Sequence, residues 1–326
     1  MELGSVLVIR PGALGDAVLT LPALHALRLS GAKSLLLLGT PPSWGFVRLS
    51  HDGLRVRDFS SSEWLGLFSE SPLGESAHAA LAAIQTAVVF LPDSSTVAVA
   101  LRRSGVANVI EATPPVASTN TNGRHASEFI LQQIASSCGA DACQKARELL
   151  SIEHDPLLAI EDDERVRALD RIGFDLVPDA GMVAIHPGSG GRKKCWSVKS
   201  FAKLAVELSC SRGLLPLVFF GPADDEVRDA FEAAIPAGVE WQPVVGRPLR
   251  EVLALLTQCR AYVGNDSGVT HLAARACPTV AIFGPTDPSI WRPLGRSVQI
   301  VRAADGNLDK VSVDDVQQAL SQFGIF

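Results

Sequence analysis

Short, almost wholly apolar segments alternate along this chain with longer segments of helical periodicity, and this alternation restricts its fold more than any other feature. Strands that are apolar on both faces suit a parallel sheet covered by helices on each side. The expected strands are residues 5–9, 34–38, 87–91 and 108–110 in the first half, and 182–186, 215–220, 260–263 and 279–283 in the second. The expected helices include residues 22–29, 127–136, 198–211, 225–234 and 249–256. The sequence therefore predicts an α/β protein built on doubly wound parallel sheets.

A break in this pattern divides the chain into two parts. The 326 residues suffice for two domains of about 150 residues each. Residues 151–156 are polar, residues 161–171 have the pattern of a charged helix, and the strand–loop–helix order then starts again near residue 181. We therefore expect a first domain over 1–155, a linker over 156–180 and a second domain over 181–326. A last helix near 313–323 could cap either domain, and the segment 113–123 reads as a loop.

Composition and charge exclude several classes of protein. The chain has 29 basic and 35 acidic residues, a net charge of −6, so we expect no nucleic-acid partner, which would need a basic face. No apolar stretch approaches the roughly 20 residues that cross a bilayer. The first residues also lack the regions of a signal peptide, and we expect a cytoplasmic protein. The six cysteines form no C-x-x-C pair and no cluster with histidine at metal-ligand spacing, which predicts reduced thiols and no metal site.

The first turn that could carry chemistry follows the strand at 5–9. It contains Gly12 and Gly15, and Asp16 comes next. Ligands of open α/β sheets bind at the carboxyl ends of strands, so Asp16 is expected at the mouth of a cleft. Two interpretations remain open: Asp16 caps a helix, or its carboxylate serves a ligand in this cleft. Pro22 either opens the following helix or kinks it. The turn lacks G-x-G-x-x-G, and no acidic residue follows the next strand, so nicotinamide binding is disfavoured.

The second turn follows the strand at 182–186. Ser189 and Gly190 lie between two further glycines. Three cations, among them Lys194, follow them and precede Trp196. Glycines let backbone N–H groups approach an anion closely, while lysine and arginine supply positive charge. The loop therefore suits a diphosphate, and the alternative is an ordinary solvated basic loop.

The third turn joins the strand at 260–263 to a helix through Asn265, Asp266, Ser267 and Gly268. Backbone N–H groups at such a helix start attract an anion, and a serine there can both cap the helix and bind that anion. His271 lies four residues after Ser267 and hence on the same helix face. The alternative for His271 is a satisfied core histidine.

Taken together, five segments resemble glycosyltransferase family 9, the lipopolysaccharide heptosyltransferases. They are residues 9–24, 186–205, 219–226, 264–274 and 283–288, in the family's order and spacing. The resemblance implies a GT-B fold, in which two Rossmann-like domains face a central cleft. The first domain would bind the acceptor and the second a nucleotide-sugar donor, ADP-heptose.

The resemblance also implies roles for individual residues. Asp16 matches the family's catalytic base, and Lys194 matches the lysine that contacts the donor phosphates. The other implied donor-binding residues are Ser189, Gly190, Asp225 at the ribose, Arg247 at the edge of the adenine site, Asp266, Ser267, Gly268 and His271. One carboxylate opposite a cationic phosphate site fits an inverting, single-displacement transfer. The sequence has no D-x-D triplet, so we expect no metal and no other cofactor.

The implied partners are a nucleotide sugar and a lipopolysaccharide core or similar glycan acceptor, with peripheral contact to the cytoplasmic face of the inner membrane left open. Three alternatives also remain open. They are a GT-B transferase that uses another nucleotide sugar, a non-catalytic nucleotide-sugar-binding homologue, and a dinucleotide-dependent oxidoreductase. The last is disfavoured because the G-x-G-x-x-G motif is missing.

Overall fold

A computed structural model describes residues 3–48, 53–69, 71–116, 121–150, 155–174 and 181–326. The chain divides into two compact units, Met1–Leu158 and Ala159–Phe326. The described part of the expected linker contains helix α7 (Asp162–Asp170), which packs against α10 (Leu249–Leu256) inside the second unit.

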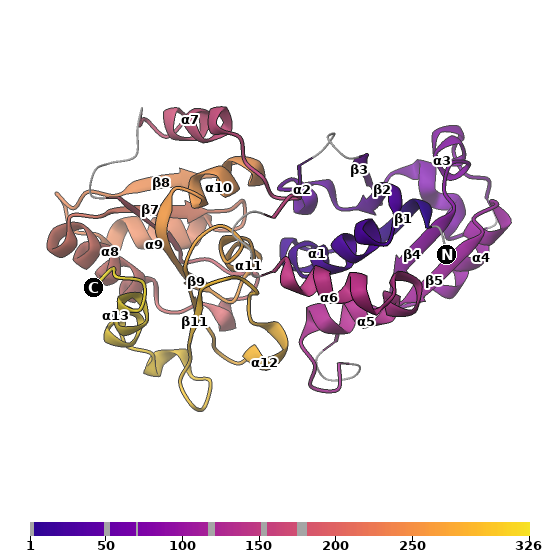
Figure 1. The fold of residues 1–326 in the computed structure, drawn as a ribbon. Coiled ribbons are helices and arrows are strands. Elements are labelled where there is room, and N and C mark those ends of the chain that lie inside the picture. Colours follow the sequence, from indigo (N-terminus) through magenta and orange to yellow (C-terminus); the bar gives the residue numbers. More distant parts are fainter. Residues whose placement is uncertain (1–2, 49–52, 70, 117–120, 151–154, 175–180) are drawn as a thin grey trace. The chain divides into compact units, whose positions relative to one another are not determined.

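The first unit is a five-stranded parallel sheet between two layers of helices (Figure 1). Its strands are β1 (Gly4–Arg10), β2 (Ala32–Gly39), β3 (Leu54–Asp58), β4 (Thr86–Phe90) and β5 (Asn108–Ala112), in the order β3-β2-β1-β4-β5. Helix α1 (Leu14–Leu29) packs with α5 (Ala126–Cys138) and α6 (Ala140–Glu148). The other face is covered by η1 (Ser62–Leu67), α3 (Glu75–Leu81) and α4 (Ser95–Arg103), and the short α2 (Pro41–Trp44) follows β2.

The second unit repeats this plan with six parallel strands. They are β6 (Met182–His186), β7 (Leu215–Phe220), β8 (Gln242–Val245), β9 (Cys259–Asn265), β10 (Thr279–Ile282) and β11 (Val298–Val301), in the order β11-β10-β9-β6-β7-β8. Helices α8 (Val198–Arg212), α9 (Asp225–Ala234) and α13 (Val313–Ser321) bury one face. The remaining elements are η2 (Arg192–Lys194), α11 (Gly268–Ala273), α12 (Pro288–Trp291) and η3 (Leu308–Lys310). Helix α13, which could have capped either domain, packs on α8 and β11.

The central strands form because both of their faces are buried. Every residue of β6 is buried, and Val183 and Ile185 pack against Trp196 and Phe201 on the α8 side. Burial of apolar surface contributes roughly 25 cal/mol per Å², so the complete burial of these strands stabilises the centre of each sheet. Both sheets have the doubly wound order. The first three strands of each unit extend the sheet in one direction, and the fourth strand pairs with the other side of the first, so that the sheet then grows in the opposite direction.

The described elements confirm most of the predicted strands and helices, and β6, β7, α9 and α10 have the predicted limits. Of the two alternatives for Pro22, the one in which it opens the first helix is wrong. Helix α1 begins at Leu14 and contains Pro22 in its interior, because eleven buried residues hold the helix against the sheet and neighbouring helices despite the missing N–H. Strands β3, β8 and β11 were not predicted, since they are partly exposed and carry polar residues or proline. In the segment 113–123, residues 113–116 and 121–123 form neither helix nor strand, and 117–120 lie outside the described residues.

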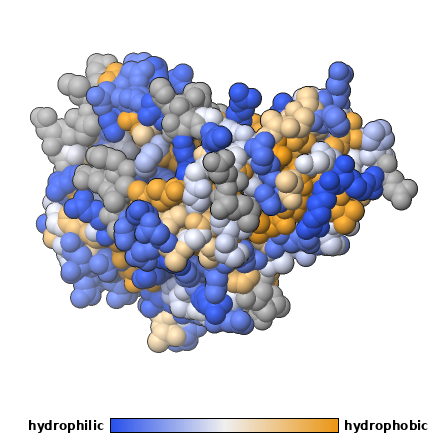
Figure 2. All heavy atoms as spheres, turned by 45° about the vertical axis from the view of Figure 1, so that its right-hand side comes forward, coloured by the Kyte–Doolittle hydropathy of each residue, from blue (hydrophilic) through white to orange (hydrophobic). Residues whose placement is uncertain are grey.

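The surface presented in Figure 2 mixes hydrophilic and apolar side chains. Large apolar side chains exposed in the described residues include Leu65 at 59%, Phe68 at 43% and Val99 at 52%, all in the first unit. Among the helices that the structure describes, none combines the length and the apolar character needed to cross a membrane.

Glu164 of α7 anchors this helix to α10 through a two-pronged ion pair. Arg250 donates from Nε to Glu164 Oε1 and from Nη2 to Oε2, both at 2.7 Å. These bonds, against the opposing effect of burial, lower the pKa of Glu164 from 4.5 to about 2. A lowered pKa in the folded state stabilises the protein above the ordinary pKa, and this contribution is lost as pH falls from about 4.5 to about 2.

We therefore expect Glu164→Gln to lower the free energy of unfolding at neutral pH by about 1 kcal/mol, since the pair is partly screened by solvent. The deficit should shrink as pH falls below the ordinary glutamate pKa, as measured by urea unfolding at several pH values. Asp163→Asn is the matched control, because Asp163 is exposed and its partner Arg167 lies on the same helix. A deficit that does not change with pH would contradict this assignment.

Candidate active site

The first unit places Asp16 at the carboxyl end of β1, the strand at which the sheet order reverses. Asp16 is the third residue of α1, and its Oδ2 accepts the Ala13 N–H at 3.0 Å. Its Oδ1 accepts a hydrogen bond from Arg10 Nη2 at 2.8 Å, and the side chain is 37% exposed. Asp16 therefore supports the helix start from inside the first turn, while its carboxylate also remains open to solvent.

Arg10 was missed by the sequence reasoning, although a lone arginine at the end of an apolar strand signals a partner. It is 4% exposed. Burial lowers its pKa, and the neighbouring Asp16 works in the opposite direction. Thr20 fixes the pair, since its Oγ1 lies 3.3 Å from Arg10 Nε and donates to the Asp16 carbonyl at 2.7 Å.

Gly12 makes this turn possible. Its φ is 141°, and a Cβ at this position would lie 2.7 Å from Asp16 Oδ2. Any side chain here would both strain the backbone and displace the Asp16 carboxylate.

The second unit brings together the loops that follow β6 and β9, the two adjacent strands at its reversal point. The buried Asp266 lies at the centre of this site. Its Oδ2 accepts from Lys194 Nζ at 2.8 Å and from Thr286 Oγ1 at 2.7 Å, and its carbonyl accepts from Ser189 Oγ at 2.7 Å. Lys194 is 37% exposed and has three N–H donors, so two donors remain for an anion. The structure thus groups three of the predicted site residues and adds Thr286, which the sequence reasoning did not single out.

The side chain of Asn265 connects the turn after β9 to the loop after β6. Its Nδ2 donates to the Pro187 carbonyl at 2.8 Å, and its Oδ1 accepts the Trp196 N–H at 2.8 Å. Because Asn265 is fully buried, these bonds fix the loop that carries Lys194 relative to the turn that carries Asp266.

The remaining predicted donor residues lie at different depths. Asp225 is exposed on the first turn of α9, with Arg228 at 3.6 Å, whereas the adjacent Asp224 is buried and accepts the Gly221 N–H at 2.7 Å. Arg247 donates to the carbonyl of Arg171 at 2.7 Å.

Three further predicted positions belong to helix α11 and its N-cap, and one lies in the loop after β6. Ser267 caps α11 by accepting the Thr270 N–H at 3.3 Å, and Gly268 is the first helical residue. His271 is only 5% exposed. Gly190 is exposed, and a Cβ there would meet open space, so this part of the loop is accessible to a ligand.

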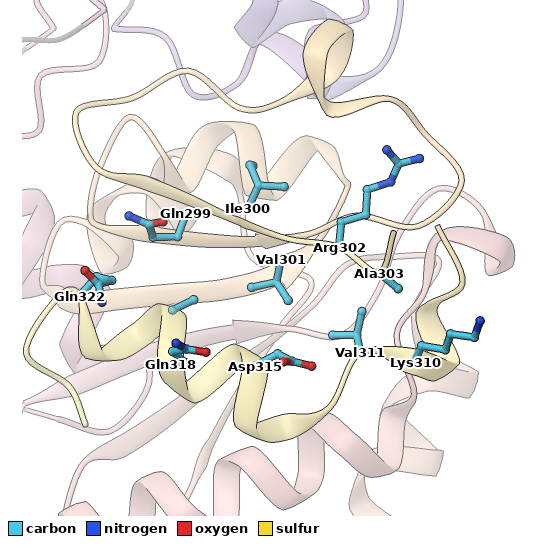
Figure 3. Close-up of a pocket in the computed structure, with 11 residues that line it drawn as sticks. Gln299, Ile300, Val301, Arg302, Ala303, Lys310, Val311, Asp315, Gln318 and Gln322 are labelled. Carbon is cyan, nitrogen blue, oxygen red and sulfur yellow. The ribbon is translucent and has the colours of Figure 1, made fainter. Parts of the chain in front are cut away.

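A cavity of about 550 Å³ lies elsewhere in the second unit, between β11 and α13 (Figure 3). Its lining includes Val301, Lys310, Asp315 and Gln318. None of the predicted site residues, all of which the structure describes, contributes to it. Within the described ranges, no three His, Cys, Asp or Glu side chains form a group that could hold a metal ion.

The model of glycosyltransferase family 9 (heptosyltransferase) matches residues 85–320. Lipooligosaccharide heptosyltransferase 2 of Haemophilus influenzae is 28% identical over 201 residues, which is 60% of this chain and 57% of the relative. Lipopolysaccharide heptosyltransferase 3 of Escherichia coli is 31% identical over 150 residues, 44% of this chain and 41% of the relative. The chain thus spans about half the length of the curated relatives it matches.

Solved structures show the fold. A family 9 glycosyltransferase from Veillonella parvula has a TM-score of 0.79 at 17% identity, covering 99% of this chain and 98% of that one. The E. coli ADP-heptose lipopolysaccharide heptosyltransferase II has a TM-score of 0.73 at 20% identity, covering 98% of each chain. These likenesses confirm the predicted α/β fold class, the GT-B fold with two Rossmann-like domains. Because the family model matches well over half of the chain, this protein belongs to glycosyltransferase family 9.

Proposed function

We propose that this protein is an inverting glycosyltransferase that moves a heptose from ADP-heptose to a lipopolysaccharide core acceptor. The curated relatives are named as lipopolysaccharide or lipooligosaccharide heptosyltransferases, and one E. coli heptosyltransferase of the same fold was solved with ADP. The observation that carries the proposal is the cluster of Lys194, Ser189 and Thr286 around Asp266, in the loops at the carboxyl ends of β6, β9 and β10, the edge at which a doubly wound sheet binds its ligand.

On the donor side, Lys194 contacts the diphosphate with the two N–H donors that Asp266 leaves available. The hydroxyl of Ser267 and the open backbone at Gly190 complete the phosphate site. The exposed carboxylate of Asp225 accepts hydrogen bonds from the ribose. The remaining donor contacts of this proposal are Arg247 at the adenine, and Gly268 and His271 in the α11 turn.

On the acceptor side, Asp16 is the general base. The acceptor oxygen forms a bond to the anomeric carbon as the bond from that carbon to the ADP oxygen breaks, and Asp16 takes the hydroxyl proton. Each carboxylate oxygen has two lone pairs, so Asp16 can accept this proton while it keeps its bonds to Arg10 and Ala13. One displacement inverts the anomeric configuration.

The charge on the departing ADP is met by Lys194 and hydroxyl donors, so the proposed reaction needs no metal ion and no further cofactor. The first unit binds the glycan acceptor, and the second binds the nucleotide sugar. The proposed location is the cytoplasm, with peripheral contact to the cytoplasmic face of the inner membrane, where a membrane-anchored acceptor would be presented.

A ligand panel tests the nucleotide specificity. In buffer with EDTA, ADP is expected to raise the Tm, because a ligand that binds only the folded state stabilises it by RT ln(1 + [L]/Kd), about 2.7 kcal/mol at 100 Kd. UDP, GDP and NAD should leave the Tm nearly unchanged. A shift by UDP or GDP alone would indicate another nucleotide sugar, and a shift by NAD alone would contradict the transferase proposal.

The sugar and the acceptor are tested by release of ADP from ADP-heptose in the presence of a lipopolysaccharide core that lacks heptose. ADP-glucose with the same acceptor is the control for the sugar. Tight ADP binding without transfer to any core acceptor would favour a non-catalytic binding protein instead.

A further inference from the structure

A line of three polar side chains runs through the second unit beneath the phosphate site. His186, the last residue of β6, is 4% exposed. Its Nε2 lies 3.1 Å from Asp224 Oδ2, and its Nδ1 lies 3.3 Å from Ser267 Oγ. A buried imidazole thus connects a buried carboxylate to a hydroxyl of the proposed phosphate site.

Asp224 determines which ring nitrogen of His186 carries hydrogen. Burial by itself would raise the pKa of Asp224, but the hydrogen bond and charge of His186 and the Gly221 N–H bring it below its ordinary value. A carboxylate can only accept, so Nε2 of His186 carries a hydrogen in either charge state of the ring. Nδ1 is therefore an acceptor when the ring is neutral and a donor when the ring is protonated.

The hydroxyl of Ser267 has one hydrogen and competing acceptors. Its oxygen accepts the Thr270 N–H and lies 3.0 Å from Thr270 Oγ1, which donates its own hydrogen to the Asn265 carbonyl. With a neutral His186, Nδ1 and Thr270 Oγ1 are both acceptors for the Ser267 hydrogen. A protonated His186 donates from Nδ1 to Ser267 Oγ, so that Nδ1 no longer accepts the serine hydrogen and a bound anion competes for it with Thr270 Oγ1 alone.

We propose that His186, held by Asp224, is a positioning residue for Ser267 and takes up a proton from solvent when the diphosphate of ADP binds. The anion favours the protonated ring, and the protonated ring in turn directs the Ser267 hydroxyl to a phosphate oxygen. ADP release returns the proton to solvent. This inference rests on the proposed function and adds a proton-linked contact to the same site.

The other charged and titratable groups around His186 do not substitute for it. Burial, followed by the charge of Asp224, raises the pKa of the Cys195 thiol. Burial raises the pKa of Tyr262 far above neutral pH, so both groups stay uncharged. Lys194 and Asp266 form an ion pair with each other. The described histidines of this region are His186 and the buried His271 of helix α11, and the His186→Gln variant distinguishes between them as the group that takes up a proton.

The experiment is calorimetric titration of the full chain with ADP in buffers of different ionisation enthalpy, between about pH 6 and 8. For the wild-type protein we expect a proton uptake on binding that folded His186→Gln lacks, and the comparison of the two proteins cancels the protons exchanged by the terminal phosphate of ADP itself. His186→Gln should abolish the uptake and weaken ADP binding about tenfold, as expected for one lost charge-assisted contact. Asp224→Asn keeps an oxygen for the Gly221 N–H and should reduce the uptake. His78→Gln, an exposed histidine on α3, is the matched control and should preserve it.

Thermal unfolding of each variant checks that it is folded. Equal proton exchange on ADP binding by wild type and folded His186→Gln would overturn this inference and leave the proposed function intact. If His186→Gln does not fold, the wild-type titration and Asp224→Asn still decide. Failure of the wild-type protein to bind ADP at all would overturn the proposed function and this inference together.

Discussion

Asp16→Asn is expected to lower kcat for heptose transfer by about 10²- to 10⁴-fold, the usual contribution of a general base. The amide oxygen can still accept the Ala13 N–H that Asp16 Oδ2 accepts at 3.0 Å, so the first turn of α1 should persist. The substitution removes the negative charge, the ability to take a proton and the acceptor for Arg10 Nη2, so thermal unfolding checks that the variant is folded. ADP affinity should be nearly unchanged, because Asp16 belongs to the first unit and the proposed phosphate site to the second. Steady-state kinetics and ADP titration measure the two effects separately.

Asp58→Asn is the matched control for this variant. Asp58 is the last residue of β3 in the same sheet and also accepts a backbone N–H, that of Ser60 at 2.9 Å. It should leave kcat within about twofold of wild type, since a surface substitution of this kind usually changes little. An unchanged kcat in Asp16→Asn would mean that Asp16 only supports the helix start and pairs with Arg10.

Lys194→Ala is expected to weaken ADP binding by about 10- to 150-fold, because a charge-assisted contact to a phosphate contributes roughly 1.5–3 kcal/mol. The substitution also leaves the 6% exposed Asp266 carboxylate without its cation, which adds repulsion toward the diphosphate. We therefore expect the upper part of this range, measured by calorimetric titration with ADP.

Lys193→Ala is the matched control, since Lys193 is the exposed neighbour in the same short helix η2. It removes the same charge from the same loop and should change ADP affinity by less than about threefold, as expected for an exposed charge screened by salt. Equal affinities of the two variants would remove Lys194 from the phosphate site and reduce its role to the ion pair with Asp266.

Prediction of the fold from sequence succeeded where burial alone determines the residue pattern. Strands β6 and β7 are apolar on both faces, and their limits agree with the structure. The edge strands β3, β8 and β11 have one neighbour each, so exposed polar residues interrupt their apolar pattern. The start of α1 was missed for another reason: Pro22 has the local signature of a helix boundary, and only the packing of its neighbours keeps it inside the helix.

The positions of the site loops could likewise be predicted from sequence, whereas the contacts between their side chains could not. The loops after β6 and β9 were found from sequence because parallel strands place all of their carboxyl ends at one edge of the sheet. Which side chains meet there is a matter of contacts between segments far apart in the chain. Lys194 and Asp266 are 72 residues apart, and His186 and Asp224 are 38 apart.

The sequence by itself determined the alternation of strands and helices, the division into two α/β parts and the turns that carry Asp16, Lys194 and Asp266, because these follow from local patterns of apolar residues and glycine. Only the tertiary structure decided that Asp16 pairs with the buried Arg10, that Thr286 joins Lys194 on Asp266, and that Asp224, not Asp225, reaches His186. Local patterns of apolar residues and glycine determine where the chain turns. Partners across a sheet are selected by the packing of several segments at once, and no single segment carries that information.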